Sequence, residues 1–123
     1  MPRTVLVVDD SAPFRASARG LLEARGYEVI GVAGDGAGAL AATRALRPDA
    51  VLLDIGLPDV PGTTVAGQLA EDGYDPAVVL VSTLDASSFG RSIDSSGARG
   101  FMTKADLGSQ RLVDLLGPPR GVT

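Results

Sequence analysis

The 123-residue sequence contains no histidine, no cysteine and no tryptophan. Without histidine or cysteine the chain has no imidazole base, no thiolate nucleophile and no ligand suited to a soft metal ion. Chemistry at any site in this protein must therefore use carboxylates, hydroxyls, amines and a hard cation.

Long apolar runs and clusters of basic residues are also missing. The longest apolar runs have the length of strands, and the start MPRTVLVVDD lacks the long apolar region of a signal peptide. Eleven basic residues stand against fifteen acidic ones, which gives a net charge of −4. We therefore expect a cytoplasmic protein with no membrane partner and no direct nucleic-acid partner.

Short β-branched segments alternate with segments of helical periodicity along the chain. We predict strands at residues 4–8, 27–33, 50–53, 77–82 and 99–103. The first helix is expected after a cap at Ser11 and before Gly26, which lies past its end. The others are expected at 37–46, from about Thr63, and at 86–96 and 109–116. The helix at 86–96 has few apolar anchors, so we expect it to be the least stable.

This alternation predicts an α/β fold in which helices cover both faces of a parallel sheet. Right-handed crossovers favour a doubly wound, flavodoxin-like sheet of five strands in the order 2-1-3-4-5. Ligands of such sheets bind at the carboxyl ends of strands 1 and 3, where the strand order reverses. The length predicts one domain, residues 1–117, followed by a short flexible tail, residues 118–123.

Four charged residues follow the predicted strands at this edge of the sheet. Asp9 and Asp10 follow the first strand, Asp54 the third and Lys104 the fifth. Neighbouring strands lie about 4.8 Å apart, so the three carboxylates can approach within roughly 5 Å of one another. Each like-charge pair then costs about 3 kcal/mol at an effective dielectric near 20. A hard divalent cation such as Mg²⁺ would offset this repulsion, because all the ligands are oxygens.

Each of these residues also has an ordinary structural interpretation. An Asp pair before a helix commonly caps it, a single Asp after a strand is commonly a turn residue, and a single Lys is commonly solvated. Ser82 and Thr83 could simply close the fourth strand. Their shared position favours a functional site, because no single structural requirement gathers these acids, hydroxyls and lysine at one edge.

The sequence resembles the receiver domain of two-component response regulators over residues 4–116. The matching segments are VLVVDDS at 5–11, LLDIGLPDVPG at 52–62, VVLVST at 78–83 and GARGFMTK at 97–104. The resemblance implies a signalling domain rather than an enzyme, able at most to catalyse its own phosphorylation and dephosphorylation. It implies a sensor histidine kinase or phosphotransfer protein as the phosphoryl donor. It also implies a downstream protein, or a second copy of the chain, bound through the face of helix 86–96, strand 99–103 and helix 109–116.

The resemblance assigns roles to the charged residues. Asp54 would accept the phosphoryl group, and Lys104 would pair with a phosphoryl oxygen. Mg²⁺ would be held by Asp10, Asp54 and the backbone carbonyl of Gly56, with Asp9 acting mainly through water.

The resemblance also implies a conformational switch. Ser82 would form a hydrogen bond to the phosphoryl group, and the Phe101 ring would turn inward as Ser82 moves. Ala105 replaces the usual proline after the lysine, so we expect either a trans bond before it or an altered loop. Thr83 is larger than the usual residue and could crowd the site, and Gly56 and Leu84 occupy positions that tune dephosphorylation.

Two enzyme classes are alternatives. Gly36, Gly38 and Ala41 fit the G-x-G-x-x-A pattern of a dinucleotide-binding loop, with Asp54 near the spacing of a ribose-binding acid. That pattern follows the second strand rather than the first. A Mg²⁺-dependent phosphohydrolase would need a second acid where Gly56 stands. For the resemblance itself, both a stand-alone receiver and the receiver part of a DNA-binding regulator remain open.

Overall fold

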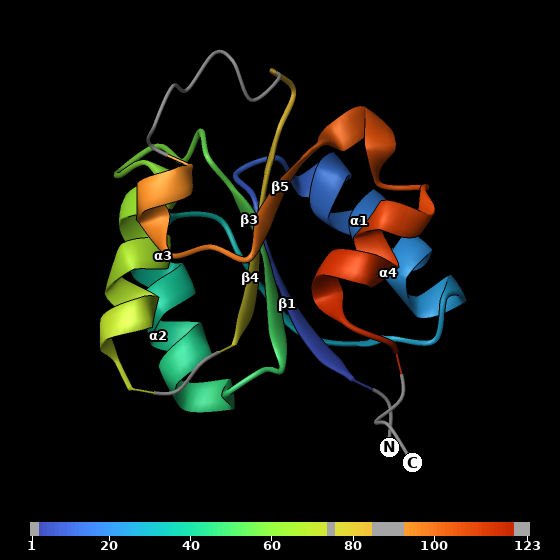
Figure 1. The fold of residues 1–123 in the computed structure, drawn as a ribbon, viewed down its shortest axis with the longest axis horizontal. Coiled ribbons are helices and arrows are strands. Elements are labelled where there is room, and N and C mark those ends of the chain that lie inside the picture. Colours follow the sequence, from blue (N-terminus) through green and yellow to red (C-terminus); the bar gives the residue numbers. More distant parts are fainter. Residues whose placement is uncertain (1–2, 74–75, 85–92, 120–123) are drawn as a thin grey trace.

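The central parallel sheet has the predicted strand order. The computed structural model describes residues 3–73, 76–84 and 93–119. Its strands lie in the order β2-β1-β3-β4-β5, which confirms the prediction. In Figure 1 the sheet lies at the centre, between two groups of helices. Their bounds are β1 Thr4–Val8, β2 Glu28–Ala33, β3 Ala50–Asp54, β4 Ala77–Ser82 and β5 Gly100–Thr103.

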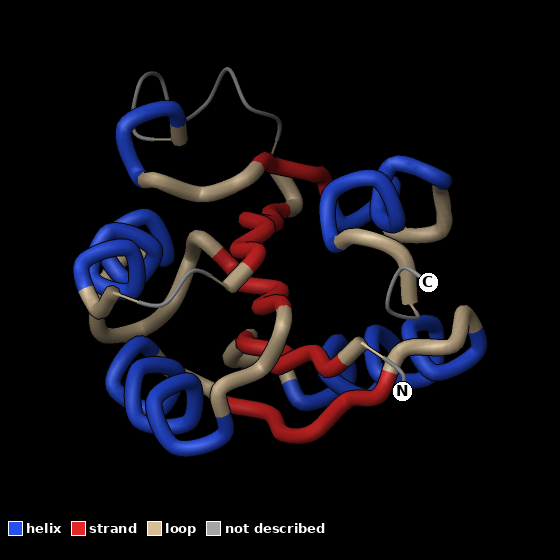
Figure 2. Tube along the Cα trace, turned by 60° about the horizontal axis from the view of Figure 1, so that its bottom comes forward, coloured by secondary structure: helices blue, strands red, loops and turns tan. Residues whose placement is uncertain are grey.

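Helices cover both faces of the sheet. Helices α1 (Ala12–Ala24) and α4 (Gln110–Leu116) lie on one face, and α2 (Gly36–Leu46) and α3 (Gly62–Glu71) on the other (Figure 2). Two 3₁₀ turns, η3 (Asp94–Ser96) and η4 (Lys104–Asp106), flank β5. Most of the predicted helix 86–96 lies outside the described residues, and its last three residues form η3. None of the helices in the described part of the chain is long and apolar enough to span a membrane.

The strands divide the core between the two faces by simple alternation. In β1, Val5 and Val7 pack with α1 and α4, whereas Leu6 and Val8 pack with α2 and α3. Successive side chains of a strand point to opposite faces, so an unbroken apolar run can serve both layers. Strands β3 and β4 are buried along their whole length. The carboxyl ends of β1, β3 and β4 are therefore positioned by the buried centre of the sheet.

Helix α1 begins and ends where the sequence predicts. The Ser11 hydroxyl accepts a hydrogen bond from the Phe14 backbone N–H at 3.3 Å, and Pro13 occupies the first turn. After the helix, Gly26 has a φ of +96°, a conformation that favours glycine. This capping fixes the start of α1 directly after Asp9 and Asp10.

The end of α4 is tied to the start of the chain. The Leu116 carbonyl accepts a hydrogen bond from Arg3 Nε, and the Gly117 carbonyl accepts one from the Tyr27 hydroxyl, both at 2.6 Å. The Pro119 carbonyl accepts a further bond from the Arg3 backbone N–H. Residues 120–123 of the predicted tail lie outside the described residues.

Candidate functional site

Three carboxylates meet at the carboxyl ends of β1 and β3. Val8 pairs with Leu53, so the residues that follow them, Asp9 and Asp54, stand side by side. One oxygen each from Asp9, Asp10 and Asp54 lies within 4.8 Å of the others. Asp9 and Asp54 are buried, whereas Asp10 is exposed. The structure thus brings together the three acids that the sequence places at the strand ends.

Lys104 follows the edge strand β5, and its side chain extends to this cluster. Its Nζ lies 2.5 Å from Asp9 Oδ2 and 3.8 Å from Asp54 Oδ1. Asp9 Oδ1 accepts a hydrogen bond from the Ser11 backbone N–H at 2.9 Å. Both Asp9 oxygens are therefore occupied by donors of the chain itself. The cluster has one positive and three negative charges, so its repulsion is only partly offset.

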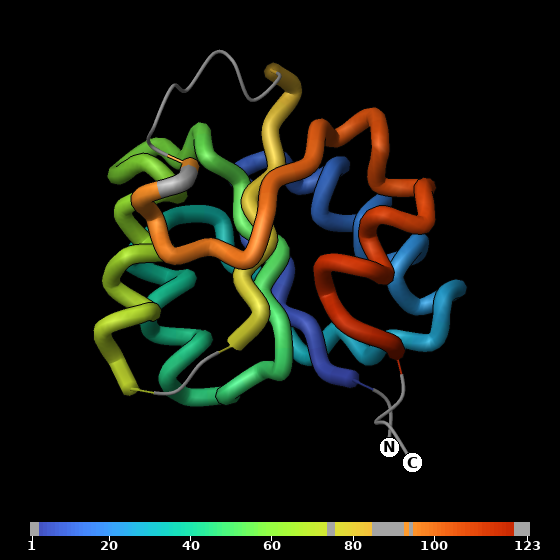
Figure 3. Tube along the Cα trace, viewed as in Figure 1, coloured from blue at the N-terminus to red at the C-terminus, as the bar shows by residue number. Residues whose placement is uncertain are grey.

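The Lys104 side chain also contacts an aromatic ring at the start of α1. Lys104 Nζ lies 4.2 Å from the centre of the Phe14 ring, within the range of a cation–π contact. The segment after β5, orange in Figure 3, runs beside α1, which brings the two residues together. An aromatic residue in the first turn after the two acids is the only sequence signal of this contact.

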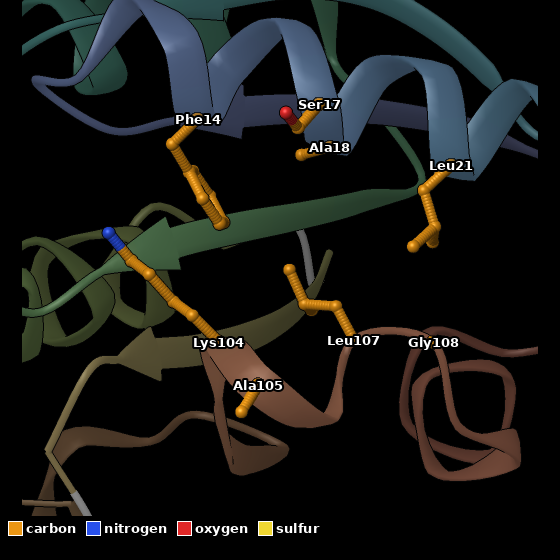
Figure 4. Close-up of a pocket in the computed structure, with 8 residues that line it drawn as sticks. All are labelled: Phe14, Ser17, Ala18, Leu21, Lys104, Ala105, Leu107 and Gly108. Carbon is orange, nitrogen blue, oxygen red and sulfur yellow. The ribbon is translucent and has the colours of Figure 1, made fainter.

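A cavity of about 480 Å³ opens next to this pair, between α1 and the segment after β5. It is lined by Phe14, Ser17, Ala18, Leu21, Lys104, Ala105, Leu107 and Gly108. Figure 4 shows the Lys104 ammonium at one end beside Phe14, with Leu21 and Leu107 further along the cavity. The lining is mainly apolar, and Lys104 belongs both to the cavity and to the acidic cluster.

The environment of Asp54 disfavours its charged form. Burial raises the pKa of Asp54 above its ordinary value, and the nearby Asp9 carboxylate raises it further. The hydrogen bond from the Gly56 backbone N–H, at 3.2 Å to Asp54 Oδ1, and the Lys104 ammonium act in the opposite direction. A cation bound at the cluster would stabilise the ionised carboxylate.

Ser82 and Phe101 lie at the neighbouring strands. Ser82 ends β4 and is buried, and its hydroxyl accepts a hydrogen bond from the Leu84 backbone N–H at 3.1 Å. Phe101, in β5, is 9% exposed and packs with the α2 and α3 side of the core. Its ring is therefore on the inner side in this structure. Thr83 is exposed at the edge of the site.

The loop from β3 to α3 contains Gly56, and a hydrogen bond joins its two ends. The Gly62 backbone N–H donates to the Ile55 carbonyl at 2.8 Å. A side chain at Gly62 would overlap the Asp54 carbonyl, so only glycine fits this close approach. Leu57 is buried, which anchors the loop to the core, while Gly56 remains exposed. As expected, the Lys104–Ala105 bond on the other side of the site is trans.

The glycine pattern at the start of α2 serves packing and capping. The backbone N–H groups of Gly36 and Ala37 donate to the Asp59 carboxylate, and that of Gly38 donates to Asp35 Oδ1. A dinucleotide would need these N–H groups for its pyrophosphate. Here two carboxylates already occupy them and would repel an anion. This geometry argues against the dinucleotide-binding alternative.

Known proteins resemble this chain in both sequence and fold. A family model described as the response regulator receiver domain matches residues 5–116. The chain belongs to the response regulator receiver family. This confirms the resemblance and identifies a signalling domain of two-component systems.

Individual relatives agree with the family match. The receiver is 42% identical to the transcriptional regulatory protein KdpE of Mycobacterium tuberculosis over 100 residues, which cover 81% of this chain and 43% of KdpE. The curated relatives that it matches are about twice its length.

Solved structures show the same architecture. The receiver domain of the response regulator NarL from M. tuberculosis superposes with a TM-score of 0.83 at 30% identity, covering 94% of this chain and 98% of that one. A CheX–CheY complex with BeF₃ and Mg²⁺ from Borrelia burgdorferi has a TM-score of 0.83 at 26% identity, covering 93% and 89%.

Proposed function

We propose that this receiver accepts a phosphoryl group on Asp54 in a Mg²⁺-dependent reaction. The observation that carries the proposal is the meeting of three carboxylates within 4.8 Å, with Lys104 Nζ 3.8 Å from Asp54 Oδ1. An all-oxygen cluster suits a hard divalent cation. The Borrelia CheY relative was solved in a complex named with Mg²⁺ and BeF₃, which supports the same chemistry here.

The residues divide the cation site between them. Within the described residues, the exposed Asp10 carboxylate accepts no hydrogen bond and forms no ion pair. This carboxylate is therefore available as a ligand. Asp54 and the Gly56 carbonyl complete the proposed direct ligands. Asp9 already accepts from Lys104 and Ser11, which favours a role through water. Bound Mg²⁺ would neutralise the charge that develops on the phosphoryl oxygens.

The reaction balances with a phosphohistidine as the donor. An Asp54 oxygen attacks phosphorus, a P–O bond forms and the P–N bond breaks, and its electron pair stays with the departing imidazole. In its ionised form Asp54 needs no general base. Lys104 is near enough to Asp54 to pair with a phosphoryl oxygen, while Phe14 limits the directions that its ammonium can take.

The switch and the partners complete the proposal. Ser82 would exchange its bond from the Leu84 N–H for one to the phosphoryl group, which would favour the inner position that the Phe101 ring already occupies here. The donor would be a sensor histidine kinase or a phosphotransfer protein in the cytoplasm. The signal would pass to a downstream protein, to a second copy, or to a DNA-binding part of a longer regulator. Catalysis would be limited to the domain's own phosphorylation and dephosphorylation.

The test is to incubate the protein with acetyl phosphate and Mg²⁺ and to measure its intact mass. We expect one added phosphoryl group in the wild type and none in Asp54→Asn. Asp114→Asn is the matched control, because it removes one exposed carboxylate of α4 and should be phosphorylated normally. Phosphorylation that persists in Asp54→Asn, or no phosphorylation of the wild type, would contradict the proposal. Tight binding of a nicotinamide dinucleotide would favour the enzyme alternative instead.

A further inference from the structure

Asp59 joins the loop after β3 to the start of α2. Its Oδ1 accepts from the Gly36 backbone N–H at 2.8 Å and from the Val60 N–H at 3.0 Å, and its Oδ2 accepts from the Ala37 N–H at 3.1 Å. Gly36 is 23 positions away in sequence. The carboxylate therefore links two separate elements rather than closing a local turn.

Capping alone does not explain this contact. Helix α2 already has a local cap, because Asp35 Oδ1 accepts from the Gly38 N–H at 2.7 Å. The helix is also fixed to the core through Ala39 and Thr43, both fully buried. Helix α2 is therefore held in place without Asp59. The main effect of Asp59 is to attach the loop after β3 to this fixed helix.

The loop after β3 packs closely against the start of α2. A side chain at Gly36 would overlap Val60, and its Cβ would lie 3.1 Å from Val65 Cγ2. Hydrogen bonds from Gly36 and then Ala37 lower the pKa of Asp59, so the ionised carboxylate is the form that holds the contact. The positive end of the α2 dipole favours the same charged form.

The loop held in this way contains the carbonyl assigned to the cation. Residues 55–61 connect Asp54 to α3 and include Gly56, which is exposed and has no buried side chain to fix it. On one side of Gly56 the loop is fixed by the end of β3. On the other side it is fixed by Leu57 and by Asp59.

We propose that Asp59 is a positioning residue for the Mg²⁺ site, which it serves by holding the loop so that the Gly56 carbonyl faces the acidic cluster. The inference rests on the proposed function, because it concerns the same cation. The hydrogen bonds of Asp59 within the described residues go to Gly36, Ala37 and Val60 and not to the cluster, so its effect would be transmitted through the loop backbone.

The test compares two aspartates that cap the same helix. Mg²⁺ is titrated calorimetrically into the wild type, Asp59→Ala and Asp35→Ala at constant ionic strength. Both variants lose hydrogen bonds at the start of α2, so both should melt at a lower temperature. We expect Asp59→Ala to bind Mg²⁺ about tenfold more weakly, as for other residues that support metal ligands. Asp35→Ala should bind it as the wild type does.

Asp59→Asn provides a milder variant in case the alanine variant does not fold. It keeps one carbonyl acceptor for the α2 N–H groups, so its Mg²⁺ affinity should lie between those of the wild type and Asp59→Ala. In ¹⁵N spectra, the Gly56 amide resonance should shift in both Asp59 variants and stay unchanged in Asp35→Ala.

The outcomes separate this inference from the proposed function. If the wild type binds Mg²⁺ and the Asp59 variants bind it equally well, the positioning role is wrong and the cation site stands. Equal weakening in the Asp35 and Asp59 variants would also overturn it, because the loss would then follow from helix capping. If the wild type binds no Mg²⁺, the proposed function itself fails.

Discussion

At the scale of single residues, the charge on Asp54 carries a cost in stability. It is 6% exposed, and its neighbours include two further carboxylates and one ammonium. A carboxylate in this setting is held in its charged form against both desolvation and repulsion. In the proposed function the same charge would attract the cation and attack phosphorus, so reactivity and instability would have one origin.

We therefore predict that Asp54→Asn is more stable than the wild type in Mg²⁺-free buffer at neutral pH. The gain should be on the order of 1 kcal/mol, since Lys104 offsets only part of the repulsion. The measurement is urea unfolding in the presence of a chelator. Asp114→Asn changes the net charge equally and should show little gain. A destabilised Asp54→Asn would mean that Lys104 outweighs burial and repulsion together.

The pH dependence of this difference follows from the raised pKa of Asp54. The native state keeps this proton to a higher pH than the unfolded chain does. The contribution of Asp54 to stability is therefore fully present below its ordinary value of 3.8 and is lost as pH rises through the native pKa. The advantage of Asp54→Asn should consequently be largest at neutral pH and disappear on acidification.

Local sequence could predict the charged residues but not all of their contacts. Asp9, Asp10, Asp54 and Lys104 follow predicted strands, and the strand order alone brings such residues to one edge. The contact between Phe14 and Lys104 depends on how α1 packs against the segment after β5. The aromatic residue after the two acids is its one local signal, and the link from Asp59 to Gly36 depends equally on how a loop packs on a helix.

At the scale of elements, regular periodicity predicted the strands and most helices. The boundaries of β1 and β4 agree with the prediction, and those of β2, β3 and β5 differ by one residue. Helix α2 begins at Gly36 rather than 37, because Asp35 and Asp59 together satisfy its first N–H groups. Long-range capping of this kind extends a helix beyond what its own residues indicate.

Two glycines in helices should respond to alanine in opposite ways. Gly36→Ala should destabilise the domain by about 1–3 kcal/mol, because the added methyl group would overlap Val60. Gly20→Ala, in α1, should stabilise it by about 0.5–1 kcal/mol, because no atom lies within 4 Å of the new Cβ and alanine favours a helix. Chemical denaturation measures both. A neutral Gly36→Ala would show that the loop can move away from α2 at little cost.

At the scale of the whole molecule, the fold separates a rigid support from a charged edge. The apolar strands β3 and β4 are buried from end to end, and the two helical layers enclose them. The three acids and Lys104 lie together at the carboxyl end of the strands, beyond the apolar side chains that form the core. Repulsion at the edge is therefore tolerated by the domain and is available to be relieved by a ligand.

Mg²⁺ should for this reason raise the thermal stability of the whole domain. At a free concentration ten times the dissociation constant, binding to the native state alone contributes about 1.4 kcal/mol, which raises the melting temperature by several degrees. The measurement is a melting curve at increasing Mg²⁺ and constant ionic strength.

Asp10→Asn removes a proposed ligand and should lose most of the increase. Asp114→Asn, with the same net charge, should keep it, because the effect depends on the cluster and not on general screening. A melting temperature that ignores Mg²⁺, or an equal rise in both variants, would contradict a cation site at this edge.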